Sequence, residues 1–326
     1  MPKSRHFHAF KESLPDASGK VYAITGTTSG TGFVAARTVA ECGGEVLLLN
    51  RASPRVPEML EKLQAAVPDG RFFPIECDLQ SFASVRRAAK AIVDHTATLN
   101  GLAHNAGVMG LPDEATEDGY DIQIQTNHLS PFLLTAILMP LLESAAEAQG
   151  DARIVSHSSF GRLHTENSGL EAHYFGPNGG KLGGNEIGFM KGGCYYRYFQ
   201  SKLANSVFTY GLAGKLNAQG SKVRALCAHP GSADTELLNR MDLNFFMRTL
   251  AKLMTLTMQS AEDGAMGLLT GMLMPDAQSG VLYGPEDNGT RGKAVPVPPQ
   301  PYETDPAAIE MLWRTSEAAT QCRLLT

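Results

Sequence analysis

Two side chains that lie four residues apart, Tyr198 and Lys202, could together carry out acid–base chemistry. Residues at this spacing lie on the same face of a helix. A free tyrosine titrates near pH ~10, but a nearby positive charge lowers the pKa of the phenol toward the working pH. Reduction of a carbonyl, or oxidation of an alcohol, by hydride transfer requires such an acid. By itself the pair is a weak signal, because ordinary surface helices carry Tyr and Lys at this spacing by chance.

A glycine-rich segment, TGTTSGTG at residues 25–32, directly follows a predicted strand and opens a predicted helix. Gly26 permits a tight turn, Gly30 lets the backbone approach a diphosphate, and Gly32 lets the helix pack close to the sheet. The N-terminus of the helix offers free N–H groups and the positive end of its dipole to phosphates. A chance turn is the alternative, but the strand before and the helix after favour a dinucleotide loop. We therefore expect cofactor contacts from Gly26, Thr28, Ser29, Gly30, Thr31 and Gly32.

The end of the second predicted strand bears on which cofactor is bound. An acidic residue there would bind the ribose 2′-hydroxyl of NAD, whereas an arginine would accommodate the 2′-phosphate of NADP. This chain has Asn50 and Arg51 at that position, with Arg55 shortly after. Arg51 could simply cap a strand at the surface. Its place about twenty residues beyond the last glycine of the loop favours NADP(H) over NAD(H).

Polar or small residues follow four further predicted strands, and ligands bind at the carboxyl ends of strands in such sheets. Any one of them could be present only because Asn, Gly, Ser and Pro are favoured in turns. Asn127 lies inside a long predicted helix, where it could simply form a local hydrogen bond that bends the helix. The residues expected at the cofactor are Asp78, Leu79, Asn105, Ala106, Gly107, Pro230, Gly231 and Thr235. Ser158 and Ser159 end the fifth strand and place a hydroxyl at the same edge.

The elements that position these residues alternate between short apolar strands and helices. Strands are expected at 21–25, 45–50, 71–76, 100–104, 153–157 and 223–228, with a seventh at 281–283. Helices are expected at 31–42, 55–66, 81–96, 115–147, 195–218 and 306–320. Apolar strands separated by helices predict an α/β fold. We expect one Rossmann-type domain with a doubly wound, mostly parallel seven-stranded sheet and helices on both faces.

The domain is expected to cover residues 20–295, between an N-terminal extension (1–19) and a C-terminal tail with a proline-rich connector and a short helix (296–326). Two segments interrupt the alternation: a Gly-rich insertion at 165–193 and an apolar, Met-rich segment at 232–260. Flexible methionines suit an adaptable apolar cavity. The second segment is therefore expected to be a flap over a hydrophobic ketone, aldehyde or secondary alcohol.

Composition argues against several other classes of protein. The net charge of −5, without a dense basic run, argues against a nucleic-acid partner. The apolar stretch at 131–142 is too short to span a bilayer, and the N-terminus has no apolar signal segment, so no membrane anchor is expected. Five scattered cysteines without a CxxC pair indicate a reduced cytoplasmic protein without disulfides or a zinc site. His104, His128, His157 and His229 match no ligand spacing, so no metal is expected.

Together the motifs resemble the short-chain dehydrogenase/reductase family over about residues 20–285. They are TGTTSGTG (25–32), NAG (105–107), SS (158–159), YFQSK (198–202) and HPG (229–231). The amino-acid sequences of segments 126–135, 198–209 and 312–320 are most similar to the retinol-dehydrogenase-like branch of this family. Protochlorophyllide oxidoreductases form a neighbouring branch. The chain departs from the family at Thr31, where an aliphatic residue is usual, in the length of the 165–193 insertion, and in lacking the membrane anchor of many retinol dehydrogenases.

The resemblance implies a role for each of four residues. Tyr198 would be the general acid or base, and Lys202 would bind the nicotinamide ribose and lower the pKa of Tyr198. Ser159 would orient the substrate oxygen, with Ser158 as the alternative if the strand ends one residue earlier. Asn127 would hold, through its backbone, a water that links Lys202 to solvent.

The implied function is an NADP(H)-dependent carbonyl reductase or alcohol dehydrogenase. The alternatives are a light-dependent protochlorophyllide-type reductase and a non-catalytic NADP(H)-sensing scaffold protein. Related proteins often pair through the helix that carries Tyr198, so a homodimer is also an expectation.

Overall fold

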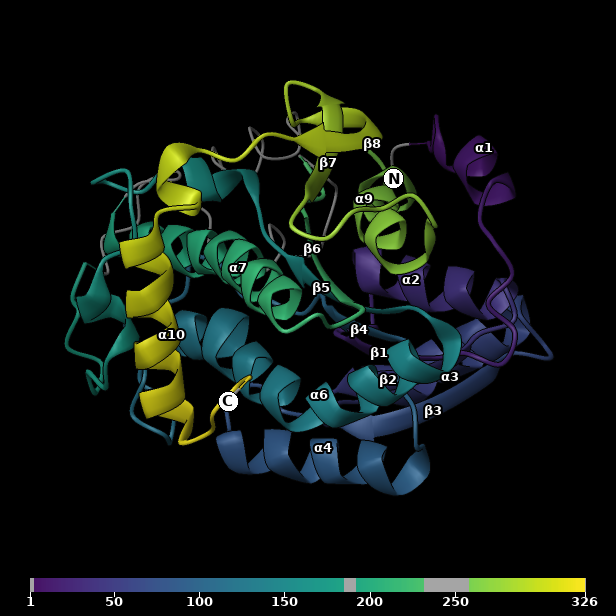
Figure 1. Ribbon diagram of the computed structural model, residues 1–326, viewed down its shortest axis with the longest axis horizontal. Helices are drawn as coiled ribbons and strands as arrows, with labels where there is room; N and C mark the ends of the chain where they lie inside the picture. The colour runs from purple at the N-terminus through teal and green to yellow at the C-terminus, as the bar shows by residue number, and fades with distance from the viewer. Residues whose placement is uncertain (1–2, 185–191, 232–257, 326) are drawn as a thin grey trace.

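The computed structural model describes residues 3–184, 192–231 and 258–325, and these residues form one sheet of eight strands (Figure 1). The strands are β1 (Val21–Thr25), β2 (Glu45–Asn50), β3 (Arg71–Glu76), β4 (Gly101–His104), β5 (Ala152–His157), β6 (Val223–Ala228), β7 (Leu282–Asp287) and β8 (Arg291–Val297). Their order in the sheet is β3-β2-β1-β4-β5-β6-β7-β8, and all neighbours are parallel except β7 and β8. The predicted α/β fold with a mostly parallel sheet is confirmed, with eight strands instead of seven.

The additional strand, β8, was not predicted, and its last two residues overlap the start of the expected proline-rich connector. Gly292, Lys293 and Pro296 are all unfavourable strand formers. The edge of a sheet tolerates proline because one side of an edge strand needs no hydrogen-bond donors. Pro296 lies opposite Tyr283 in the antiparallel β7–β8 pair. The expected domain boundary after residue 295 therefore falls inside a strand.

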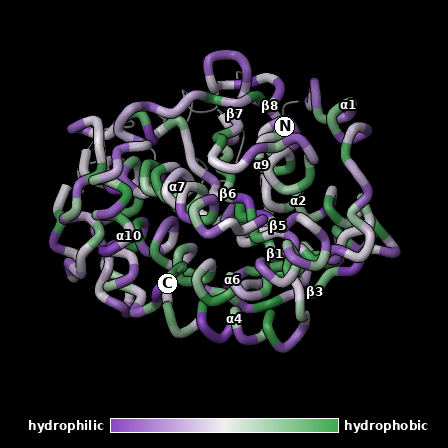
Figure 2. Tube along the Cα trace, in the orientation of Figure 1, coloured by the Kyte–Doolittle hydropathy of each residue, from purple (hydrophilic) through white to green (hydrophobic). Residues whose placement is uncertain are grey.

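Helices cover both faces of the sheet (Figure 1). On one face lie α2 (Gly30–Glu41), α3 (Arg55–Ala66) and α9 (Ala261–Leu273), and on the other α4 (Phe82–His95), α6 (Ser130–Gln149) and α7 (Gly193–Ala218). In β1, Tyr22 and Ile24 pack toward the first group, whereas Ala23 packs toward the second. Both faces of the central strands are buried, which explains why the strands read as continuous apolar runs. Figure 2 shows this apolar character along the strands and the surrounding helices.

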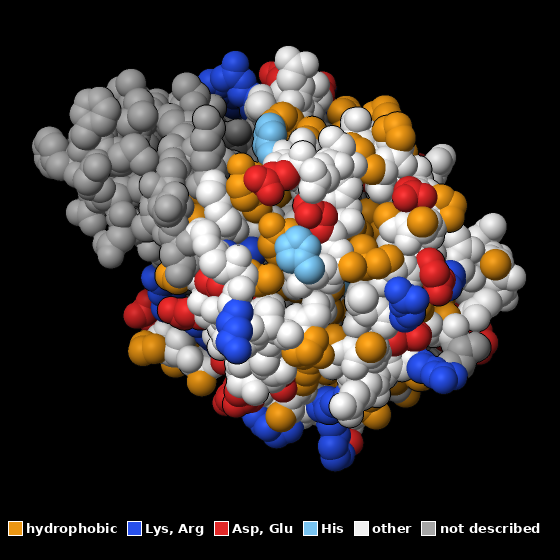
Figure 3. All heavy atoms as spheres, turned by 90° about the vertical axis from the view of Figure 1, so that its left-hand side faces the viewer, with side chains coloured by type: hydrophobic (Ala, Val, Ile, Leu, Met, Phe, Trp, Pro, Cys, Tyr) orange, Lys and Arg blue, Asp and Glu red, His pale blue; other side chains and the backbone are white. Residues whose placement is uncertain are grey.

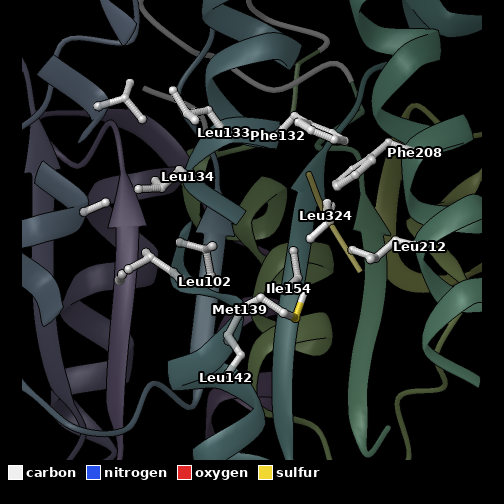
Figure 4. Close-up of a cluster of buried hydrophobic side chains, with 14 of the residues drawn as sticks. Leu102, Phe132, Leu133, Leu134, Met139, Leu142, Ile154, Phe208, Leu212 and Leu324 are labelled. Carbon is white, nitrogen blue, oxygen red and sulfur yellow. The ribbon is translucent and has the colours of Figure 1, made fainter. Parts of the chain in front are cut away.

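The helix predicted from residue 115 begins at Ile122, because residues 115–121 form a turn closed by a bridge between Ala115 and Asp121. It runs through α5 (Ile122–Ile124), the π-helical η1 (Gln125–Leu129) and α6. Among the described residues, this helix is long and apolar enough to cross a membrane by length and composition alone, but 67% of its most apolar window is buried. Its leucines pack against the sheet and α7, as Figure 4 shows.

Shorter elements surround this core. The C-terminal helix α10 (Pro306–Thr320) packs on α7 and α6, and α1 (Phe7–Glu12), which was not predicted, packs on α9. The 3-10 turns in the described ranges lie near the carboxyl edge or in the C-terminal tail, and they are η2 (Phe160–Leu163), η3 (Ala172–Phe175) and η5 (Pro301–Glu303). The described part of the Gly-rich insertion contains η3. The expected flap lies outside the described residues except for 258–260.

Candidate active site

A cleft of about 620 Å³ opens at the carboxyl ends of β1 to β4. Most of the predicted cofactor residues line it: Gly26, Thr28, Ser29, Gly30, Thr31, Arg51, Asp78, Leu79, Asn105, Ala106 and Gly107. Asn50 and Arg55, the neighbours of Arg51 noted in the sequence, also line it. Further lining residues were not predicted, among them Ser53, Cys77, Gln80, Val108 and Thr126. Their position next to the predicted residues at the strand ends was the signal that could have found them.

Three glycines shape the loop between β1 and α2. Gly26 and Gly30 have φ of +71° and +59°, a region that side chains other than glycine rarely adopt. A Cβ on Gly32 would lie 2.2 Å from the carbonyl oxygen of Gly26, so no larger residue fits, although Gly32 does not itself line the cleft. The side chain of Ser29 does not cap α2, which leaves the first N–H groups of this helix available to a phosphate.

Asn105 ties this loop to the end of β4. Its Nδ2 donates to the carbonyl oxygens of Thr25 and Gly26, both at 3.0 Å. Its Oδ1 accepts from the hydroxyl of Thr31 at 2.9 Å. The threonine that departs from the family pattern therefore helps to anchor the loop. The narrow loop and the free helix N-terminus fit a dinucleotide diphosphate.

The two residues at the end of β2 have different roles: Asn50 supports the glycine loop, and Arg51 faces the cleft. Asn50 is buried, and its side chain accepts from the N–H of Thr27 at 2.8 Å and donates to the Thr27 hydroxyl at 2.7 Å. Asn50 therefore braces the glycine loop. Arg51 is exposed and lines the cleft, where its guanidinium is available to an anionic group.

Tyr198 and Lys202 lie together on α7, both buried. The ammonium of Lys202 lies 5.8 Å from the centre of the Tyr198 ring and donates to the carbonyl oxygen of His157 at 3.0 Å. Burial raises the pKa of Tyr198 to about 12, against a hydrogen bond with Ser159 that lowers it. Burial also lowers the pKa of Lys202 to about 8. The pKa of Tyr198 was expected to be lowered, but it is raised in this structure, because burial outweighs the effect of Ser159.

Of the two serines after β5, Ser159 is the one that acts on Tyr198, since its hydroxyl lowers the pKa of the phenol. Its oxygen also accepts from the N–H of Gly161 at 3.1 Å, so its own proton can be donated elsewhere. Ser158 is buried, and its hydroxyl donates to the carbonyl oxygen of Lys202 at 2.6 Å. Ser158 thus braces α7, which leaves Ser159 as the hydroxyl at the site.

Asn127 lies in the π-helical turn, with its side chain fully engaged. It accepts from the N–H of Val108 at 2.8 Å and donates to the Val108 carbonyl and the Ser201 hydroxyl, each at 2.9 Å. Pro131, four residues later, has no N–H to offer to the carbonyl of Asn127. A Cβ on Gly107 would lie 3.0 Å from Lys202 Nζ and 3.1 Å from Asn127 Oδ1, so the cleft wall at Gly107 lies directly beside both residues.

Pro230 and Gly231, which follow β6, are not among the residues that line the described cleft. Gly231 has φ of +63°, and a Cβ there would lie 2.3 Å from the carbonyl oxygen of Thr290. Gln259 donates to the carbonyl oxygen of Pro230 at 2.6 Å. Thr235 lies outside the described residues.

Four histidines, three at strand ends and His128 in η1, are buried. Burial lowers the pKa of His104, His157 and His229 to about 3 and that of His128 to about 4, which keeps them neutral. Within residues 3–184, 192–231 and 258–325, no group of three or more His, Cys, Asp or Glu side chains could hold a metal ion.

The sequence and the fold both match known proteins. The family model for short chain dehydrogenases matches residues 20–169. An uncharacterized oxidoreductase of Schizosaccharomyces pombe is 34% identical over 73% of this chain and 67% of its own length. Polyprenol dehydrogenase of Mus musculus is 33% identical over 81% of this chain and 75% of its own length, and retinol dehydrogenase 11 of Homo sapiens is 32% identical over 76% and 70%.

Among solved structures, an uncharacterized protein of Mycobacterium Paratuberculosis is 28% identical, with a TM-score of 0.73 over 99% of both chains. The chain belongs to the short-chain dehydrogenase/reductase family.

Proposed function

We propose that this protein is an NADP(H)-dependent oxidoreductase that transfers a hydride between the nicotinamide and a hydrophobic ketone, aldehyde or secondary alcohol. The observation that carries the proposal is the buried pair of Tyr198 and Lys202, in which the ammonium lies 5.8 Å from the centre of the phenol ring. Ser159 lies near enough to the same phenol to lower its pKa. Lys202 lies beside the cleft wall at Gly107. An acid, an orienting hydroxyl and a cation are the groups that this chemistry requires.

In carbonyl reduction, Tyr198 donates its phenolic proton to the substrate oxygen as that oxygen gains negative charge. The bound nicotinamide supplies the hydride. Ser159 donates a hydrogen bond to the same oxygen and fixes it beside the phenol. Lys202 offers its positive charge to the developing phenolate, and the carbonyl of Asn127 holds a water through which the proton is replaced. Alcohol oxidation uses the same groups in reverse and begins from the Tyr198 phenolate.

The choice of NADP(H) depends on Arg51. Its exposed guanidinium at the cleft suits a 2′-phosphate, and β2 ends in Asn50 and Arg51 instead of a carboxylate. We expect Arg51→Ala to weaken NADPH binding by about tenfold or more, the size of one lost charge-assisted hydrogen bond. NADH binding should change less than about twofold, because NADH has no 2′-phosphate. Equal losses for both cofactors in a fluorescence titration would contradict this assignment.

The hydrophobic substrate class is supported by the surroundings of Tyr198 and by the relatives. Cys194, Tyr195 and Phe199 form a buried cluster with Tyr198, and Met109 packs against it. Two relatives are named for polyprenol and retinol, which are long apolar alcohols. A panel of apolar carbonyls and alcohols, assayed in the dark with both cofactors at the nicotinamide absorbance band, tests the proposal. Turnover that requires light, or no turnover of any member of the panel, would count against it.

A further inference from the structure

The loop of residues 108–111 connects the cofactor cleft with the surroundings of Tyr198. Val108 lines the cleft, and Met109 packs against the aromatic cluster that contains Tyr198. Gly110 has φ of +66°, and a Cβ on it would lie 3.6 Å from the ring of Tyr195. Any shift of this loop would therefore move a wall next to Tyr198.

Side chains from two helices hold the backbone of this loop at both ends. Asn127 binds the N–H and the carbonyl of Val108, as described above. At the other end, the Leu111 N–H donates to Gln123 Oε1 at 3.4 Å, and the Leu111 carbonyl accepts from Arg197 Nη2 at 3.2 Å. Gln123 in turn donates to the carbonyl oxygen of Cys194 at 2.8 Å, which ties the same helix to the start of α7.

Arg197 directly precedes Tyr198 and is completely buried. Its Nε lies 3.0 Å from Asp121 Oδ2, and Nη1 donates to the carbonyl oxygen of Gly183 in the Gly-rich insertion. Asp121 uses its other oxygen to accept from the N–H groups at the start of the helix at Ile122. One guanidinium thus joins α7, the start of that helix, the 108–111 loop and the insertion.

A buried ion pair is weak support for a role in stability alone. Desolvation of two charges offsets most of their attraction, so hydrophobic replacements are often as stable. The planar guanidinium, however, can direct donors to several acceptors at fixed angles. Arg197 contacts the backbone carbonyls of two separate segments, and these contacts fix the position of both segments relative to α7.

We propose that Arg197 is a positioning residue that, together with Asp121, holds the 108–111 loop and the backbone at Gly183 against α7 and so sets the shape of the substrate side of Tyr198. The effect on turnover rests on the proposed role of Tyr198, whereas the effect on the loop does not. Arg197 acts through the loop and does not itself contact the reacting atoms.

Three substitutions test this role, with a matched control. Arg197→Met removes the charge and every donor, whereas Arg197→Lys keeps the charge but cannot reach both carbonyls. Asp121→Asn keeps the helix cap and removes the negative charge. The control is Arg153→Met, because Arg153 is also buried and lies 2.7 Å from Asp151, but at the opposite end of β5.

Two readouts separate the loop from the chemistry. In Arg197→Met, amide hydrogen exchange in residues 108–111 should become at least about tenfold faster, because the loop opens locally. The ratio of kcat/KM between a bulky and a small carbonyl should change by about tenfold, since a displacement of about 1 Å has effects of this size or larger. NADPH affinity should stay within about twofold. Arg197→Lys and Asp121→Asn should fall between wild type and Arg197→Met.

The proposal is overturned if the Arg197 and Asp121 variants change exchange and selectivity no more than Arg153→Met does. If Arg197→Met does not fold, Arg197→Lys and Asp121→Asn are compared with Arg153→Met in the same two measurements, and the same criterion applies. If exchange in 108–111 rises but no form of the protein reduces any carbonyl, the positioning role stands and the proposed function fails.

Discussion

At the scale of single residues, burial shifts both Tyr198 and Lys202 toward their neutral forms. The pKa of Tyr198 rises to about 12, and that of Lys202 falls to about 8. At neutral pH Tyr198 therefore holds the proton that carbonyl reduction needs. Lys202 is still largely charged at pH 7 but titrates within the range in which an enzyme can be assayed.

The pKa of Lys202 leads to a prediction for the pH profile of carbonyl reduction. Because burial lowers this pKa, the ammonium is present below about pH 8 and is lost as the pH rises through that value. We expect kcat/KM, which reports groups of the free enzyme, to fall above about pH 8. Lys202→Arg should remove this alkaline decline, even at lower activity, because a guanidinium stays charged. An unchanged decline in that variant would assign it to another group.

At the scale of secondary-structure elements, the N-terminal segment is bound to the domain through α9. The Asp263 carboxylate accepts from the Ser4 hydroxyl at 3.0 Å and from the N–H groups of Arg5, His6 and Phe7 at 2.9 to 3.0 Å. Phe7 is buried against the same helix group. Residues expected to form a separate extension therefore pack on the helix that lies beside β4 to β8.

Asp263 should consequently contribute measurably to stability. Asp263→Ala removes the acceptor for these four donors and should lower the free energy of unfolding by about 1.5–3 kcal/mol, as for a hydrogen-bonded charged group. Urea denaturation followed by circular dichroism measures this change. Glu12→Ala, at an exposed position of α1, should change it by less than about 0.5 kcal/mol. Similar values for the two variants would show that the segment is not held by Asp263.

The sequence predicted those elements whose signal is local. The apolar runs of β1, β2, β3 and β6 gave their observed bounds, and the glycine loop identified the phosphate side of the cleft. The helix α9 was not predicted, because Gly264, Gly267 and Gly271 lower its helix propensity. A Cβ on Gly271 would lie 2.9 Å from a methyl group of Val155. Close packing against the sheet, and not local helix propensity, therefore accounts for the formation of α9.

The parts of the site that depend on distant partners could not be predicted in the same way. Asp121 and Arg197 lie far apart in sequence, and no local pattern pairs them. The same holds for Asn105, which joins the ends of two strands and a helix. The pKa shift at Tyr198 was predicted with the wrong sign, because the spacing to Lys202 contains no information about burial.

At the scale of the whole molecule, α7 is enclosed by other parts of the same chain. Helix α10 packs across it (Figure 1), and Trp313 stacks on Phe208 with ring centres 5.8 Å apart. In the described part of the chain, no residue from Gly193 to Ala213 is exposed. On the face of the molecule drawn in Figure 3, acidic and basic side chains are interspersed, so no surface of one charge marks a partner there.

This enclosure bears on the expected homodimer. A second copy could pair through α7 only if α10 moved away, which would expose Trp313 and Phe208 to water. We therefore predict a monomer with the chain mass of 34.9 kDa in size-exclusion chromatography with light scattering. A stable particle of twice that mass at micromolar concentration would contradict this prediction.

The most direct test of the central claim is the turnover of Tyr198→Phe, which removes one hydroxyl and keeps the ring. Carbonyl reduction by NADPH should fall by about 10²- to 10⁴-fold, the contribution of a general acid, while NADPH affinity stays within about twofold. Tyr196→Phe, the same change two residues away, should retain turnover within about twofold. If Tyr198→Phe reduces every substrate as fast as the wild type does, Tyr198 is not the acid, and the proposed chemistry is wrong.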